Sequence, residues 1–278
     1  MVKILDGKKL SELLATELVE RVKSLSVTPK LVIIQVGNLE ESNTYVKNKK
    51  IFAEKIGILV EHKKYPENIA EQEIISDVFK YNADLSVHGL IVQLPMPKHL
   101  SPHNIIESID PKKDTDALTA SNTKLLFDDH AGLMPNTTKG ILSLLEHYKI
   151  KIAGQKVVIV GQSTLVGKPT ALAFLNRKAT VTVCHKYTHN LAQETKLADI
   201  LVVAAGEPNL ITVEYVSPGQ TVVDVGINTI DGKTIVGDVD YQNVSKVVSA
   251  ITPVPGGIGP MTVASLFENL LESLFSQT

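Results

Sequence analysis

The feature that most restricts the possible folds is an alternation of short β-branched runs with longer amphipathic stretches. Residues 31–36, 58–65 and 87–92 are predicted strands, the last one stopped by the prolines of the following loop. Residues 41–56 have helical spacing and end at Gly57, where glycine suits a left-handed cap. Parallel sheets covered by helices show this pattern, so the predicted class is α/β.

A second series of the same kind follows a turn-rich stretch at residues 111–129 and a predicted helix at 139–148. Its predicted strands, separated by stretches long enough for crossover helices, are residues 156–160, 180–184, 200–204 and 221–225. This spacing predicts a Rossmann-like parallel sheet.

Chain length indicates two domains, because 278 residues exceed the roughly 100 to 200 residues of one domain. We place the first at residues 1–121 and the second at 122–278. Residues 261–275 have helical periodicity, and this terminal helix must bury its apolar face against one of the two domains. The helix at about residues 261–278 can pack either on the second domain or back onto the first.

Composition excludes several classes of function. Apolar residues make up 44% and charged residues 21%, so the chain can bury substantial cores and is not globally disordered. A net charge of −2 gives no indication of nucleic-acid binding. The single cysteine, Cys184, excludes an intramolecular disulfide framework and a cysteine zinc cluster, and no metal is predicted. The chain shows no secretory signal and no run near the roughly 20 apolar residues that span a bilayer, so we expect a cytoplasmic protein without a membrane partner.

A candidate phosphate-binding turn lies in the sequence VVIVGQSTLVGKP. Gly161 directly follows a predicted strand, Gln162 and Ser163 continue the turn, and Gly167 precedes the next helix. Glycine lets the backbone approach a pyrophosphate, and the amides of a helix start favour anionic oxygens. The spacing is G-x-S-x-x-x-G rather than G-x-G-x-x-G, so a tight turn without a ligand is the alternative.

The nucleotide preference depends on the end of the next strand. A cofactor without a 2′-phosphate is usually held by an acid about 20 residues further on, and no acid occurs there. His185 and Lys186 occupy this place and favour NADP over NAD by pairing with its phosphate, whereas a solvated lysine and an incidental histidine are the alternative. We interpret Cys184 as a small buried side chain rather than a nucleophile.

Several segments together resemble one family, namely SNTYVKNKKIFAEKIGI, GLIVQLPMP, PKKDTDA, VGQSTLVGKP, DVGIN, GDVDY and ITPVPGGIGPMT. In this order and spacing, the chain is similar to the bifunctional methylenetetrahydrofolate dehydrogenase/cyclohydrolases over nearly its whole length. The resemblance implies oxidation of 5,10-methylenetetrahydrofolate with NADP, then hydrolysis of the 5,10-methenyl product to 10-formyltetrahydrofolate. It also implies a folate cleft between two α/β domains, a homodimer, and a role in the one-carbon metabolism that serves purine biosynthesis.

The resemblance also assigns site residues. It gives Lys49 the acid/base role in hydrolysis, while Tyr45 orients the substrate or the lysine, Gln93 holds the lysine in its working protonation state, and Asp116 contacts the pterin ring. Further residues expected at the folate are Pro255, Gly256 and Gly257. The residues expected at the cofactor are Gly161, Gln162, Ser163, Gly167, His185, Lys186 and Ile227. Asp224 and Gly226 mark a strand end near the nicotinamide and receive no catalytic role.

The residue types suit this chemistry. Tyr45 and Lys49 are four positions apart, so a helix places them on one face. A cationic methenyl group disfavours the charged form of a nearby lysine and lowers its pKa, which lets Lys49 activate water. Gln93 follows a predicted strand, and open α/β sheets bind ligands beyond the carboxyl ends of their strands. Without the family, each residue has an ordinary alternative. Lys49 is then a solvated amine and Tyr45 a half-buried ring. Gln93 is then a loop-capping side chain, and Asp116 belongs to a solvated acidic turn.

Two departures from the family concern the folate side. The usual Lys-Asp-Val-Asp-Gly segment reads KDTDA here, so Ala117 stands in the glycine position. If that position has a positive φ, Ala117 is strained or shifts Asp116. A Pro-Cys-Thr-Pro element is replaced by PNTT at residues 135–138, which alters the start of the next helix, although Thr138 can still cap it.

On the cofactor side, Gln162 occupies a position often held by arginine, and Lys186 lies where a small hydroxyl residue is common. Lys186 is therefore a candidate to replace the arginine at the 2′-phosphate. These departures leave two alternative functions open: a dehydrogenase with weak cyclohydrolase activity, and a non-catalytic folate- or nucleotide-binding paralogue.

Overall fold

The computed structural model describes residues 2–232 and 234–277. The chain forms two compact units, which we describe separately. Unit 1 contains residues 2–11 and Thr137–Thr262, and unit 2 contains Glu12–Asn136 and residues 263–277. The predicted boundary between two domains, at residues 121 and 122, stays a prediction.

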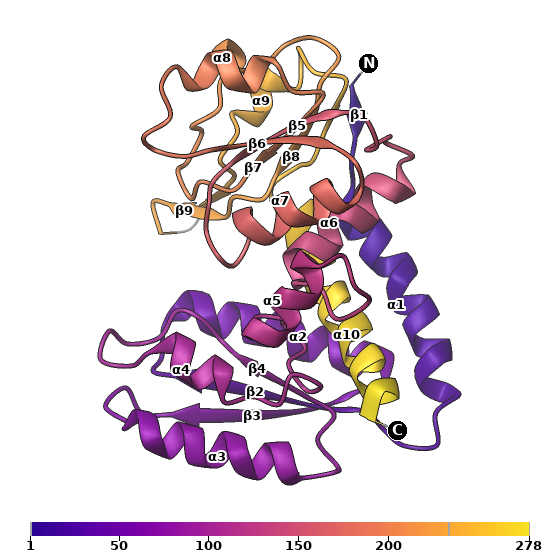
Figure 1. Ribbon diagram of the computed structural model, residues 1–278, viewed down its shortest axis with the longest axis vertical. Helices are drawn as coiled ribbons and strands as arrows, with labels where there is room; N and C mark the ends of the chain where they lie inside the picture. Colours follow the sequence, from indigo (N-terminus) through magenta and orange to yellow (C-terminus); the bar gives the residue numbers. More distant parts are fainter. Residues whose placement is uncertain (1, 233, 278) are drawn as a thin grey trace. The chain divides into compact units, whose positions relative to one another are not determined.

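Unit 2 is built on a parallel sheet with the strand order β3–β2–β4 (Figure 1). Its strands are β2 (Lys30–Val36), β3 (Leu59–Tyr65) and β4 (Gly89–Val92). Successive side chains of a strand point to opposite faces, so β2 contributes Leu31 and Ile33 to one core and Val32 and Ile34 to another. The strands predicted for the first series are confirmed, although β4 begins only at Gly89.

Helices cover both faces of this sheet. They are α1 (Gly7–Lys23), α2 (Glu40–Ile56), α3 (Glu71–Ala83), α4 (Pro102–Glu107) and α10 (Ile258–Gln277). Residues of α1, α2 and α10 pack on one face, and residues of α3 and α4 pack on the other. Phe52 of α2 stacks on Phe267 of α10 with ring centroids 5.5 Å apart. The terminal helix therefore buries apolar side chains against the sheet of the first series.

The stretch at residues 111–129, predicted to be rich in turns, has turns in its first part, but a helix that was not predicted, α5 (Ala120–Phe127), occupies most of the rest. Thr119 caps α5, since its hydroxyl accepts a hydrogen bond from the Asn122 amide at 3.4 Å. A helix of eight residues is too short for its periodicity to stand out in the sequence.

Unit 1 contains a parallel sheet with the order β1–β11–β8–β7–β5–β6. Its strands are β1 (Lys3–Ile4), β5 (Lys156–Val160), β6 (Thr180–Cys184), β7 (Ile200–Val203), β8 (Thr221–Asp224) and β11 (Ala250–Ile251). This arrangement confirms the Rossmann-like sheet. Strand β1, which pairs with β11 at the sheet edge, was not predicted.

The remaining elements of unit 1 surround this sheet. They are α6 (Asn136–His147), α7 (Gly167–Asn176), α8 (Leu191–Lys196), the 3-10 helix η1 (Val213–Tyr215), α9 (Tyr241–Val244) and the antiparallel pair β9 (Asn228–Ile230) and β10 (Thr234–Val236). Figure 1 shows α8 and α9 on one side of the sheet and α7 on the other. Helix α6 begins three positions before the predicted residue 139. Within residues 2–232 and 234–277, no helix combines the length and apolarity needed to cross a membrane.

Candidate functional site

A lysine and a glutamine from different elements meet at the carboxyl end of β4. Lys49 of α2 donates a hydrogen bond from Nζ to Oε1 of Gln93 at 3.0 Å. The Gln93 side chain is buried, and its Nε2 donates to the Leu94 carbonyl at 2.7 Å. This second bond fixes the amide so that its oxygen faces the lysine. The structure thus brings Lys49 and Gln93 together at the kind of sheet edge where open α/β sheets bind ligands.

Burial and a nearby charge have opposite effects on the pKa of Lys49. Burial lowers the pKa of the Lys49 ammonium, because desolvation disfavours its charged form, and the Asp116 carboxylate partly offsets that shift. Burial also raises the pKa of the Asp116 carboxyl, against the effects of Lys49 and of a hydrogen bond from Asn136. Lys49 and Asp116 therefore sense each other's charge, and a lysine with a lowered pKa is better suited to proton transfer near neutral pH.

Tyr45 lies on α2 one turn before Lys49 and is partly buried. Burial raises the pKa of its phenol, and the nearby Glu41 adds to the shift. A phenol of this kind stays protonated at neutral pH, so Tyr45 is available as a hydrogen-bond donor rather than as a base.

Asp116 lies in a turn whose backbone departs from common geometry. Ala117 is fully buried and has a φ of 56°, so the left-handed conformation considered for this position is present. Asn136, the first residue of α6, donates from Nδ2 to Oδ1 of Asp116 at 2.6 Å. Sequence reasoning noted the altered segment at Asn136 but missed this contact.

The phosphate turn of unit 1 has no room for side chains at its two glycines. A Cβ on Gly161, whose φ is 122°, would lie 2.1 Å from the Ala204 carbonyl oxygen, and a Cβ on Gly167 would lie 2.1 Å from the Gly161 oxygen. The Ser163 hydroxyl accepts hydrogen bonds from the amides of Val166 at 3.2 Å and Gly167 at 3.4 Å. The turn at the start of α7 is exposed and needs glycine at both positions for its own backbone packing, and its contact with a pyrophosphate stays a prediction.

The segment after β6 carries the residues considered for nucleotide preference. Lys186 is exposed, with its ammonium 4.9 Å from the ring centroid of Tyr187. His185 is partly buried, and its Nδ1 accepts a hydrogen bond from the Tyr187 amide at 3.2 Å. Cys184 is fully buried, and burial raises the pKa of its thiol, which fits a packing role. Ile227 follows β8 and is exposed.

Two aspartates of unit 1 were not recognised as a pair from the sequence. The Asp224 carboxylate accepts hydrogen bonds from the amides of Asp238 and Val239, each at 3.0 Å. Asp238 is fully buried and accepts from the amides of Ala205 at 2.6 Å and Gly206 at 2.9 Å. Burial raises the pKa of Asp224 to about 7. The pair fixes the loop after β7, and its signal in the sequence was an aspartate in each of the segments DVGIN and GDVDY.

The loop before α10 also belongs to unit 1. Gly256 has a φ of 105°, and a Cβ on Gly257 would lie 2.5 Å from the Pro253 carbonyl oxygen. Pro255 is exposed. The loop therefore has the lack of side chains expected for close ligand approach, and its contact with folate stays a prediction.

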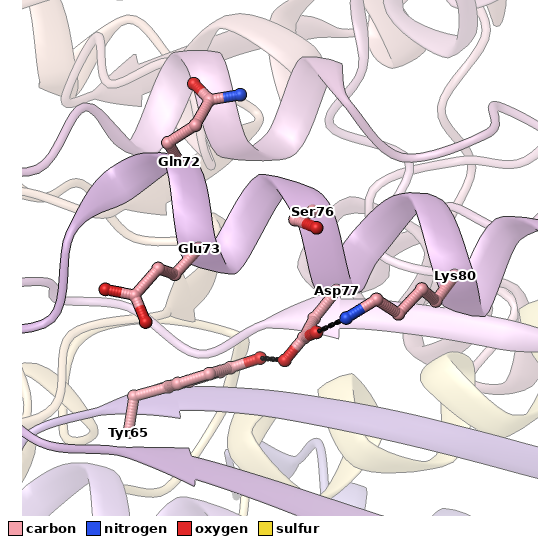
Figure 2. Close-up of a pocket in the computed structure, with 6 residues that line it drawn as sticks. All are labelled: Tyr65, Gln72, Glu73, Ser76, Asp77 and Lys80. Carbon is pink, nitrogen blue, oxygen red and sulfur yellow. Dashed lines mark hydrogen bonds and ion pairs between the residues drawn. The ribbon is translucent and has the colours of Figure 1, made fainter.

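A separate open pocket lies beside α3 in unit 2 (Figure 2). Its lining residues are Tyr65, Gln72, Glu73, Ser76, Asp77 and Lys80. Within it, Asp77 accepts hydrogen bonds from the Tyr65 hydroxyl at 2.8 Å and from Lys80 at 2.7 Å. Asp77 and Lys80 therefore pair with each other, and none of the expected catalytic residues lines the pocket.

A nucleotide-type sheet in one unit and, in the other, a partly buried lysine whose pKa responds to a nearby carboxylate define a dehydrogenase that also carries its own proton-transfer group. Family models describe the same two parts: the catalytic domain of tetrahydrofolate dehydrogenase/cyclohydrolase matches residues 5–116, and its NAD(P)-binding domain matches residues 135–278. The chain belongs to the tetrahydrofolate dehydrogenase/cyclohydrolase family.

Similar proteins span the whole chain. The Bifunctional protein FolD of Nautilia profundicola is 44% identical over 97% of this chain and 96% of its own length. The crystal structure of the bifunctional enzyme FolD from Campylobacter jejuni has a TM-score of 0.97 and 42% identity, covering 100% of both chains. The Trypanosoma brucei FolD structure, complexed with NADP cofactor and inhibitor, has a TM-score of 0.95 and 31% identity, covering 99% of this chain and 98% of that one.

Proposed function

We propose that this protein is a bifunctional enzyme that oxidises 5,10-methylenetetrahydrofolate with NADP and then hydrolyses the 5,10-methenyl product to 10-formyltetrahydrofolate. Its family membership supports both activities. The observation that carries the assignment of residues is the hydrogen bond between Lys49 and Gln93, because it presents a lysine of lowered pKa at a ligand-binding sheet edge.

In the hydrolysis step, we assign Lys49 the role of general base. The neutral amine takes a proton from water as the water oxygen bonds to the cationic methenyl carbon. In the resulting adduct, the hydroxyl proton passes to the leaving nitrogen as the carbon–nitrogen bond breaks, which yields the 10-formyl product. The one proton released overall is the proton that Lys49 took from water. Gln93 orients the lysine, and Tyr45 serves as a hydrogen-bond donor to the substrate or to the lysine.

In the oxidation step, hydride leaves the methylene carbon and the product is a cation spread over two nitrogens and the carbon between them. Bound NADP⁺ supplies the hydride acceptor. We assign Gly161, Gln162, Ser163 and Gly167 to its pyrophosphate, His185 and Lys186 to its 2′-phosphate, and Ile227 to the nicotinamide end. Asp116 stabilises the developing positive charge and holds the pterin. No proton transfer is needed, so Lys49 matters less for this step.

Further parts of the proposal depend on the family likeness. We propose that the loop Pro255, Gly256 and Gly257 contacts folate, that the active form is a homodimer in the cytoplasm, and that the product serves purine biosynthesis. Light scattering combined with size-exclusion chromatography tests the homodimer, because a mass of one chain contradicts it.

A two-step spectrophotometric assay tests the function. Formation of the methenyl compound reports the dehydrogenase, and its decay reports the cyclohydrolase. We expect the wild-type protein to carry out both steps, whereas Lys49→Met abolishes decay and retains part of the oxidation. Lys50→Met is the matched control, since Lys50 is an exposed neighbour that contacts His62 at 3.1 Å. Accumulated methenyl product from wild type would favour a monofunctional dehydrogenase, and equal retention of both activities in Lys49→Met would remove the role of that lysine.

A further inference from the structure

A chain of buried side-chain amides ends on the carboxylate of Asp116. Asn136 is 5% exposed and donates from Nδ2 to Oδ1 of Asp116 at 2.6 Å. An amide N–H donates more strongly to an ionised carboxylate than to a neutral carboxyl group, so this bond favours the charged form of Asp116. The Asn136 carboxamide is a full N–H donor, so Asp116 has a strong hydrogen-bond partner at this place.

Asn269 on α10 fixes the orientation of Asn136. It is fully buried, and its Nδ2 donates to the side-chain oxygen of Asn136 at 2.8 Å. Because the oxygen of Asn136 is occupied in this way, its NH₂ group must face Asp116. The same nitrogen of Asn269 donates to the carbonyl of Thr115 at 3.1 Å, so it also holds the residue before Asp116.

The turn around Asp116 needs this support. Ala117 keeps a φ of 56° without the freedom of glycine, so the backbone alone does not favour the observed turn. A carboxylate in a buried place also requires donors, because desolvation favours its neutral form. The ionisable groups that interact with Asp116 are Lys49 on α2 and Asp114 in the same turn.

We propose that Asn136, oriented by Asn269, is a positioning residue that keeps the Asp116 carboxylate ionised and directed for folate binding. This inference rests on the proposed function for its substrate. It adds two residues to the folate side of the enzyme, and neither of them needs to touch the substrate.

Asn122 of α5 provides a matched control. Asn122 is also buried, and its Nδ2 donates to Oδ2 of Asp114 at 3.0 Å. Asp114 is held in addition by the Thr119 amide at 2.7 Å. Asn122→Ala therefore removes the same kind of bond from the neighbouring carboxylate while leaving the partners of Asp116 in place.

The experiment compares Asn136→Ala and Asn122→Ala in the full-length protein. For Asn136→Ala, we expect the KM for 5,10-methylenetetrahydrofolate to rise about tenfold or more, the usual size of a lost hydrogen bond to a charged group. The acidic limb of the kcat/KM profile should move to higher pH, because Asp116 then protonates more readily. Asn122→Ala should lower the melting temperature and change both quantities much less, because it acts on Asp116 only through the charge of Asp114.

A direct titration separates this inference from the function. With ¹³C-labelled aspartate, and the Asp116 signal identified by its loss in Asp116→Asn, the titration midpoint of that carboxyl should rise in Asn136→Ala. If Asn136→Ala does not fold, Asn136→Cys keeps a small side chain with a weak donor and should give a smaller rise. An unchanged midpoint and profile in the folded variant, or equal changes in Asn122→Ala, would overturn the inference. An inactive wild-type protein would refute the proposed function, while a raised midpoint would still support the positioning of Asp116.

Discussion

Lys49 Nζ lies 3.0 Å from Gln93 Oε1, and the bond between the Gln93 amide and the Leu94 carbonyl gives the lysine a neutral acceptor. A neutral acceptor stabilises the ammonium less than a carboxylate does, so the lowering of the Lys49 pKa by burial persists. The identity of residue 93 therefore sets how readily Lys49 loses its proton.

We expect Gln93→Glu to slow hydrolysis by roughly 100-fold at neutral pH, the lower end of what general acid–base catalysis contributes. A carboxylate at this place raises the pKa of Lys49 and keeps the lysine protonated, so activity should recover as the pH rises. The decay rate of the methenyl compound across pH measures this. Gln72→Glu, on the exposed side of α3, is the control, and a pH profile equal to wild type in Gln93→Glu would contradict the prediction.

Asp224 should make the protein less stable as the pH rises. Its pKa is raised from 3.8 to about 7 in the folded protein, so the folded state holds a proton that the unfolded state releases. The resulting stability is fully present below about pH 4 and is lost as the pH rises through about 7. Asp224→Asn should flatten this decline in urea unfolding experiments.

The control for that measurement is Asp77→Asn. Hydrogen bonds from Lys80 and Tyr65 lower the pKa of Asp77 to about 2, so its contribution has the opposite sign and is lost only as the pH falls through about 2. A decline between pH 4 and 7 that is as steep in Asp224→Asn as in wild type would show that other groups cause it.

Substitution by glycine should change the stability of the protein differently at two residues that have a positive φ. Lys178 is exposed, with a φ of 64°, and follows the C-terminus of α7, so Lys178→Gly should stabilise the protein by about 1 kcal/mol. Ala117→Gly relieves a similar strain but loses a buried methyl worth about 0.8 kcal/mol and adds unfolded-state freedom, so its net effect should be within about 0.5 kcal/mol of zero. Urea denaturation of both variants measures the difference, and equal stabilisation would contradict this account.

Lys186 should control the choice between NADP and NAD. Lys186→Ser removes the exposed positive charge assigned to the 2′-phosphate, so kcat/KM for NADP should fall by about tenfold while that for NAD stays near wild type. Steady-state oxidation with both cofactors measures this. Lys196→Ser removes an exposed lysine on α8 as the control, and a wild-type preference for NAD would refute the assignment of Lys186.

Periodicity predicted most of the fold because long, regular elements leave a signal in one sequence. Strands such as β5 and helices such as α2 contain enough residues for a pattern to be distinguished from chance. The two residues of β1 have no period, and their place is set by pairing with β11 almost at the other end of the chain. A strand of that kind becomes visible only when its partner is known.

At the site, contacts between residues far apart in the sequence were missed. The family resemblance supplied the roles predicted for Lys49 and Gln93, and the strand-end argument gave an independent reason to place Gln93 near a ligand. The contact between Asn269 and Asn136 joins residues 133 positions apart, and no local pattern encodes it. The available signal was a polar asparagine in the apolar stretch of the terminal helix, where a buried amide needs a partner.

The order of the chain has a consequence for how the protein is made. One core of unit 2 contains Ile33 of β2 together with Leu266, Phe267 and Leu270 of α10, which are synthesised after all of unit 1. On the ribosome, the three-stranded sheet therefore emerges with an apolar face that α1 and α2 cover only in part until the last helix follows. A nascent chain in this state is a natural client for chaperones, and a gene truncated before α10 would yield a product that aggregates instead of a free-standing half.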